Sequence, residues 1–255
     1  MVKGLDLFRR HFAGHSSQYV LIGGTAASLA LENAGLEFRA TKDLDIVLHV
    51  EALDAAFGTA FWAFVEQGRY QIRQSTGSGR PLLYRFAKPG DDRFPAMLEL
   101  FSRAPIGFTV ATGSHLTPIP LTEAVASLSA ILLDEDYYGF ITSGRRESDG
   151  LPWVGEDRLI PLKASAWLDL TARQARGEAV DSKDVRKHMT DVIRLSQLLT
   201  PDLRIPLAAR IRGDLNRFLD ALASDHSLDP KALKIRATVQ EIIGRIAQAY
   251  ALGRP

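Results

Sequence analysis

The stretch VLIGGTAASLALENAGLEFRATKDLDIVL, residues 20–48, decides the fold of the N-terminal part of this chain. The apolar run at residues 19–24 ends in two glycines, which predicts a buried strand followed by a tight turn. Alanine and leucine then recur at helical spacing as far as Asn33-Ala34-Gly35, a sequence typical of a helix end. The β-branched run over residues 43–50 predicts a second strand. We therefore expect a strand, a helix and a strand.

The neighbouring residues extend this pattern to a whole domain. Apolar residues at helical spacing predict amphipathic helices at residues 5–13 and 51–67. Three short runs, YQIRQ, PLLYRFAKP and AMLELFSR, predict strands separated by Gly-, Ser- and Pro-rich turns. Residues 115–124 would add an edge strand, since their prolines argue against a central one. We expect an α/β (α+β) domain over residues 1–160, with a mixed sheet and flanking helices.

The remainder of the chain has helical spacing. From Pro161 onward we expect a helical domain, residues 161–255. Ser182 is the expected N-cap of one helix, and Asp229-Pro230 is expected to open the last helix, which runs to about Tyr250.

Residues 131–153 are polar and rich in turn residues. They predict either an exposed hairpin or a loop. Asp134 to Tyr138 is expected to be a solvated loop. Arg145-Arg146 is expected to be a solvated loop or a contact for a polynucleotide backbone.

Composition excludes several classes of function. The 255 residues carry a formal net charge of +1, so any surface for nucleic acid must be local. Because there is no cysteine, disulfides, thiolate metal sites and cysteine nucleophiles are excluded. The N-terminus lacks the pattern of a signal peptide, and no apolar run approaches the ~20 residues that span a bilayer. We expect a soluble cytoplasmic protein without a membrane partner.

Gly23-Gly24-Thr25 stands between the first strand and the first helix that follows it. Glycines at this point allow a ligand to approach the backbone, and the free N–H groups of a helix start favour an anion such as phosphate. The pattern is neither a P-loop nor a dinucleotide fingerprint. A simple tight turn is the competing interpretation.

Asp43 and Asp45 are two residues apart on the second strand, so their carboxylates share a face. Two adjacent carboxylates repel each other and are costly to bury without a cation, and Mg²⁺ is suited to such oxygen ligands. Glu99 shares its strand face with Met97 and Phe101 and would supply the third acid of a two-metal site. The alternatives are a solvated strand entry for the aspartates and an edge charge for Glu99.

Taken together, IGGTAASLAL and FRATKDLDIVL resemble the nucleotidyltransferase superfamily related to DNA polymerase β. More narrowly, GGTA followed by RATKDLD is similar to the AbiEii/AbiGii toxins of type IV toxin–antitoxin and abortive-infection systems. The resemblance covers residues 19–103 and continues more loosely into residues 163–195. It implies that a nucleoside triphosphate (NTP) is bound by Gly23, Gly24, Thr25, Arg39 and Thr41. It also implies that Mg²⁺ is held by Asp43, Asp45 and Glu99, although Glu99 stands where many relatives have aspartate.

The resemblance also assigns residues of the helical part. Lys163 would reach the triphosphate as a point charge, and Asp184 would complete the catalytic set. The family has a further aspartate four residues after that position, where this chain has His188, with Asp191 beyond it. An ordinary surface lysine and a structural Asp184–His188 pair are the competing interpretations.

Three functions follow from these expectations. In the first, a Mg²⁺-dependent nucleotidyltransferase (EC 2.7.7-like) moves NMP from an NTP to an RNA hydroxyl, with a tRNA 3′ end as one candidate, and inhibits growth until a cognate antitoxin counters it. In the second, the same chemistry modifies a small molecule or a protein. In the third, catalysis has been lost, and the chain binds a nucleotide or a partner protein.

Overall fold

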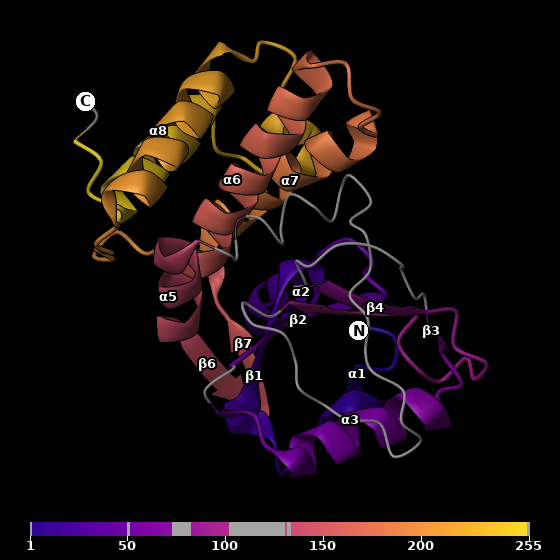
Figure 1. Cartoon of the computed structure of the whole chain (residues 1–255). Coiled ribbons are helices and arrows are strands. Elements are labelled where there is room, and N and C mark those ends of the chain that lie inside the picture. The colour runs from indigo at the N-terminus through magenta and orange to yellow at the C-terminus, as the bar shows by residue number, and fades with distance from the viewer. Residues whose placement is uncertain (1, 50–51, 73–82, 102–130, 132–133, 254–255) are drawn as a thin grey trace. The chain divides into compact units, whose positions relative to one another are not determined.

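A mixed sheet organises the N-terminal half of the computed structural model, which describes residues 2–49, 52–72, 83–101, 131 and 134–253. The chain divides into two compact units, one from residues 1–122 and 142–154 and the other from residues 123–141 and 155–255. The first unit contains the sheet and the second is helical (Figure 1). The expected α+β class with flanking helices is confirmed.

The described strands of the first unit form one sheet in the order β3-β4-β5-β2-β1-β7-β6. The central strand β2 pairs with β1 in antiparallel and with β5 in parallel orientation, so the sheet is mixed. The strands are β1 (Tyr19–Ile22), β2 (Asp43–Leu48), β3 (Gln71–Ile72), β4 (Leu83–Ala87), β5 (Met97–Phe101), β6 (Arg145–Ser148) and β7 (Leu151–Val154).

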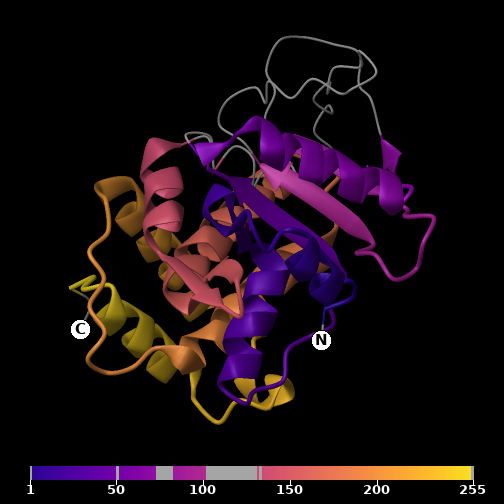
Figure 2. The same ribbon diagram turned by 90° about the horizontal axis from the view of Figure 1, so that it is seen from below.

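One face of this sheet is covered by aromatic side chains from helices α1 (Leu5–His11) and α3 (Ala55–Gln67). The ring of Tyr19 lies 5.5 Å from that of Phe8 and 6.4 Å from that of Phe57, measured between centroids. Phe8, Phe57 and further rings of α3 and β4 are buried. Figure 2 views the unit from the side of these two helices. Residues that alternate with Tyr19 along the strands therefore point to the opposite face.

Helix α2 (Gly23–Asn33) packs against β1 and β2 on that opposite face. Thr25 is fully buried, and its hydroxyl donates to the backbone carbonyl of Asp43 at 2.8 Å. The helix ends where the sequence predicted, because Gly35 adopts a φ of 71°, which is left-handed. The turn at Gly23 thus places the start of α2 beside the beginning of β2.

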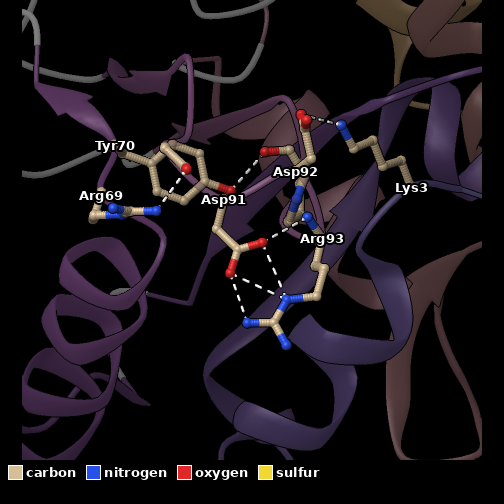
Figure 3. Close-up of polar contacts among 8 residues, drawn as sticks. Lys3, Arg69, Tyr70, Asp91, Asp92 and Arg93 are labelled. Atoms are coloured by element: carbon tan, nitrogen blue, oxygen red, sulfur yellow. Dashed lines mark hydrogen bonds and ion pairs between the residues drawn. The ribbon is translucent and has the colours of Figure 1, made fainter.

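The connection between β4 and β5 is held by a network of polar contacts (Figure 3). Arg69 donates to the carbonyl of Gly90 at 2.7 Å, and the Tyr70 hydroxyl donates to that of Pro95 at 2.7 Å. Arg93 hydrogen bonds to Asp91 and lowers the pKa of that exposed carboxyl to about 2. These contacts hold the connection beside the end of α3, and β4 pairs with β5 in antiparallel orientation.

Residues 145–154 form the hairpin β6–β7, one of the two structures that the sequence allowed. Asp149 and Gly150 both have positive φ, as a two-residue hairpin turn requires. Arg145 and Arg146 therefore belong to a strand. The expected edge strand at residues 115–124 lies outside the described residues.

The expected loop at residues 134–138 is wrong. Helix α5 (Glu135–Ser143) begins there because the Asp134 carboxylate accepts hydrogen bonds from the N–H groups of Asp136 and Tyr137. Tyr137 and Tyr138 are buried, and the hydroxyl of Tyr137 donates to Asp214 at 2.8 Å.

The second unit packs α6 (Glu156–Ala175) against α7 (Ser182–Leu195) and α8 (Ala209–Ser224). The N-cap of α7 is Asp181, whose carboxylate accepts from the N–H of Lys183, and the expected cap Ser182 is the first helical residue. None of the helices in the described ranges has the length and apolar character needed to cross a membrane.

The last expected helix is interrupted. A short 3₁₀ turn, η4 (Pro230–Leu233), ends at Lys234, which has a left-handed φ of 61°. Helix α9 (Val239–Ala249) then starts afresh with a capping box between Thr238 and Glu241.

Helix α6 also begins earlier than expected, because Pro161 lies inside it and not at its start. Proline has no N–H, so the carbonyl of Asp157, four residues earlier, loses its normal helical donor. The hydroxyl of Tyr250 donates to that carbonyl at 2.8 Å. A residue far along the chain thus supplies the hydrogen bond that Pro161 removes.

Tyr250→Phe should therefore lower the free energy of unfolding by about 1 kcal/mol, since the part-buried carbonyl of Asp157 loses this donor. In a Pro161→Ala background the cost should be smaller, because the alanine restores a backbone N–H that can reach the Asp157 carbonyl. Urea denaturation of the four proteins gives the coupling directly. Equal costs in the two backgrounds would show that Tyr250 does not replace the missing donor.

Candidate functional site

The candidate site is a row of side chains that crosses four neighbouring strands of the first unit. The strand registers place Arg85 opposite Glu99, Glu99 opposite Asp45, and Asp45 opposite Ile22. Residues directly opposite each other in a sheet share a face. The row lies on the face that carries α2. Asp45 is opposite Ile22, and Ile22 points away from the aromatic face to which Tyr19 belongs, because side chains alternate along a strand.

Asp45 approaches the start of α2 closely. Its Oδ2 accepts from the backbone N–H of Gly24 at 3.3 Å. Gly23 has a φ of 65°, and a Cβ at this position would lie 1.7 Å from the same oxygen. Gly23 is therefore required both by the turn and by the carboxylate, which interacts favourably with the positive end of the helix dipole.

Arg39 and Thr41 close over the same helix start. A Cβ built on Gly24 would lie 2.8 Å from Thr41 Oγ1 and 3.5 Å from Arg39 Nη2. The structure therefore brings four of the five expected phosphate-binding residues together. The fifth, Thr25, is also at this helix start, but its hydroxyl is used to bind the Asp43 carbonyl.

Glu99 is the most perturbed acid of the row. Arg85 donates to Glu99 Oε1 from Nε at 2.8 Å and from Nη2 at 2.6 Å. Burial, together with repulsion from Asp45, raises the pKa of Glu99 to about 8, and Arg85 opposes this increase. Glu99 is thus the acid of the row whose protonated form the protein favours.

The donor chemistry of this row fits a hard divalent cation. Asp43 and Asp45 are half-buried and share the face of Glu99. A cation would relieve the repulsion between Asp45 and Glu99, and Mg²⁺ needs only one or two protein carboxylates besides phosphate oxygens and water. No group of three or more His, Asp or Glu side chains in the described ranges is arranged as a metal site.

The expected residues of the second unit have different surroundings. Lys163 is buried, and its Nζ lies 2.7 Å from Asp191 Oδ2, with both side chains at most 5% exposed. Lys163 is therefore not the surface lysine of the competing interpretation. Asp184 is half-buried, two turns earlier on α7 than Asp191.

Sequence reasoning missed two of these partners. Arg85 precedes the buried Phe86 in a predicted strand, so the two side chains point to opposite faces. A cationic side chain on the strand before that of Glu99 was the feature of the sequence that could have indicated a partner for Glu99. Asp191 lies among Met189, Val192 and Leu195 on the buried face of α7, where a lone carboxylate needs a partner.

Comparison with known proteins adds no family assignment. No protein-family model matches the chain, and no match was found among curated proteins.

Gly23→Ala should destabilise the protein much more than Gly35→Ala. Both glycines have left-handed φ values, which cost a residue with a Cβ about 1–2 kcal/mol. Only at Gly23 would the Cβ also collide with Asp45, whereas at Gly35 nothing lies within 4 Å. Thermal and urea denaturation of the two variants give the comparison. Equal losses would show that Asp45 does not press on this turn.

Glu99→Gln should gain stability relative to the wild type as the pH rises from 5 to 8. In this range the folded protein keeps the Glu99 proton that the unfolded chain has lost, so the wild type becomes less stable by up to about 1.4 kcal/mol per pH unit. Glutamine has no such proton to lose. Urea denaturation of both proteins at several pH values measures this effect, and a pH-independent difference would contradict the raised pKa.

Proposed function

We propose that this chain is a Mg²⁺-dependent nucleotidyltransferase that moves NMP from an NTP to an acceptor hydroxyl. The observation that carries the proposal is the position of Asp45, which lies between the glycine start of α2 and the buried Glu99. A glycine helix start and paired carboxylates thus meet on one face of the sheet, and such an arrangement would suit phosphate binding and the transfer of a phosphoryl group.

The roles of the residues follow from their positions. The start of α2 and the side chains of Arg39 and Thr41 would bind the triphosphate, with the guanidinium as a charged clamp. Asp43, Asp45 and Glu99 would hold Mg²⁺. The chemistry that Mg²⁺ would supply there is activation of the acceptor hydroxyl and neutralisation of charge on the leaving pyrophosphate.

We further propose, from the motif GGTA…RATKDLD, that the chain is a toxin of the AbiEii/AbiGii type that acts in the cytoplasm. The acceptor would then be RNA, with a tRNA 3′ end as one candidate, and an antitoxin would counter the activity. Lys163 and Asp184 are the residues of the helical unit to which this resemblance gives catalytic roles.

A second function, nucleotide binding without catalysis, is favoured by one specific observation. Arg85 already contacts one oxygen of Glu99 through two nitrogens, so the protein itself partly occupies the third acid. Such a chain would bind an NTP tightly and transfer nothing.

Asp45→Ala should reduce the transfer of labelled NMP from NTPs to total RNA by at least about 100-fold, because the cation loses a ligand in the transition state. The matched control is Asp92→Ala, which removes an exposed carboxylate paired with Lys3 (Figure 3) and should leave transfer unchanged. Electrophoresis of the labelled products measures both.

The other outcomes distinguish the alternatives. Label in a protein band or a metabolite would replace RNA as the acceptor while keeping the chemistry. Tight NTP binding in calorimetry, without turnover on any acceptor, would favour the binding function. Transfer that survives Asp45→Ala would rule out the proposed site.

A further inference from the structure

We propose that the outer face of helix α7 binds the phosphate backbone of a polynucleotide. The inference concerns the helical unit alone and does not depend on the carboxylate row of the sheet. It gives a function to Lys183, Arg186, Lys187 and Arg194, which have no role in the proposed transferase chemistry. These four residues are called the basic face of α7 below.

The basic face follows from the spacing of its residues along α7 (Figure 1). Arg186 and Lys187 come three and four residues after Lys183, and Arg194 comes two turns after Lys187, so all four lie on one side of the helix. Lys183, Arg186 and Lys187 are exposed, and Arg194 is half-buried. At 1.5 Å per residue, the row extends along roughly 16 Å of the helix axis.

No acid neutralises the basic face within the described residues. None of its four side chains forms an ion pair there. Other arginines of the same unit do form such pairs, since Arg173 and Arg176 contact Glu178, and Arg210 contacts Asp134. The cations of α7 therefore differ from the other surface cations of this unit in being available to a ligand.

The carboxylates of α7 lie away from the basic face. Asp191 is buried and binds the ammonium group of Lys163 at 2.7 Å. Asp181 caps the helix, because its carboxylate accepts from the N–H of Lys183 at 2.8 Å. Asp184 is half-buried, and successive residues of a helix point about 100° apart. The basic face is thus a row of positive charge without an acid in it.

Helix stability does not explain this row. Like charges three or four residues apart on a helix repel each other, as Lys183 does with Arg186 and Lys187. Lys183 also lies in the first turn, where the helix dipole disfavours a cation. A bound anion that extends along the helix would relieve both effects.

A polynucleotide is the anion that fits the basic face best. Its charges form a line, as the cations do, and contacts from lysine and arginine release its condensed counterions, even in a protein whose net charge is only +1. An anionic membrane is the other extended anion. A helix that binds a membrane inserts its apolar face, but Met189, Val192 and Ile193 of α7 are buried within the protein.

The two arginines for which the sequence allowed this role have other contacts. Arg145 donates to the carbonyl of Ser16 at 3.1 Å and forms an ion pair with Glu147. The guanidinium of Arg146 lies 5.7 Å from the centre of the Trp153 ring. The structure therefore favours α7 over the β6–β7 hairpin as the surface for a polynucleotide.

The experiment is fluorescence anisotropy with the full-length protein and a labelled oligouridylate of about 20 nucleotides, without NTP or Mg²⁺. The affinity of the wild type should fall linearly, on logarithmic scales, as the salt rises from about 50 to 200 mM. Lys183→Gln/Lys187→Gln should bind at least about tenfold more weakly at about 100 mM salt. Its slope should be smaller by about 1.4, because two phosphate contacts are lost.

The matched control is Arg204→Gln/Arg212→Gln, which removes the same charge from two exposed positions of the same unit outside α7. It should bind as tightly as the wild type, and so should Lys183→Arg/Lys187→Arg, which keeps the charge. Glutamine is a good helix former, so α7 should still form, and circular dichroism verifies this. If the double variant does not fold, Arg186→Gln replaces it and should weaken binding about fivefold.

Three results would overturn the inference: no binding of the oligouridylate by the wild type, unchanged binding in Lys183→Gln/Lys187→Gln, or an equal loss in the matched control. Binding to vesicles of phosphatidylserine and phosphatidylcholine in place of the oligouridylate would also overturn it and would assign the basic face to a membrane. Failure of the proposed function looks different. If the oligouridylate binds through α7 while no NMP is transferred, the inference stands and the transferase activity is excluded.

Discussion

The approach of the Asp45 carboxylate to the backbone of Gly23 and Gly24 is the constraint on which the first unit depends. No residue with a side chain can replace Gly23 without displacing the carboxylate. The same contact joins β2 to the start of α2, and the Thr25 hydroxyl joins them a second time. The strand–helix–strand core is therefore held together at the point where its candidate chemistry lies.

This arrangement places repelling carboxylates side by side on two inner strands of the sheet. Glu99 and Asp45 face each other across a parallel pair of strands, and burial makes their repulsion stronger than it would be in water. The Arg85 guanidinium, which contacts Glu99, relieves part of this repulsion. Groups held close together at such a cost are common at functional sites, where a ligand supplies the missing charge.

Short-range sequence patterns predict much of this structure. The features that they do not predict depend on residues that are distant in sequence. The periodicity of residues 19–48 predicts the strands and the helix because each depends on local burial and on Gly35 as a stop. Arg85 and Asp191 were missed because their partners are set by strand register and helix packing. The sequence suggested that Pro161 stands at a helix start. It is tolerated inside α6 because the hydroxyl of Tyr250, far away in the sequence, donates to the carbonyl that lacks a backbone donor.

The row of charges also affects how the sheet can assemble. A slip of β2 by one residue would turn Asp43 and Asp45 toward the phenylalanine rings of the other face and would bring Leu44 and Ile46 out beside α2. Uncompensated carboxylates among aromatic rings make that arrangement costly. The residues proposed for chemistry thus also discriminate against misaligned strands, so loss of the acids would make folding less selective as well as removing a ligand site.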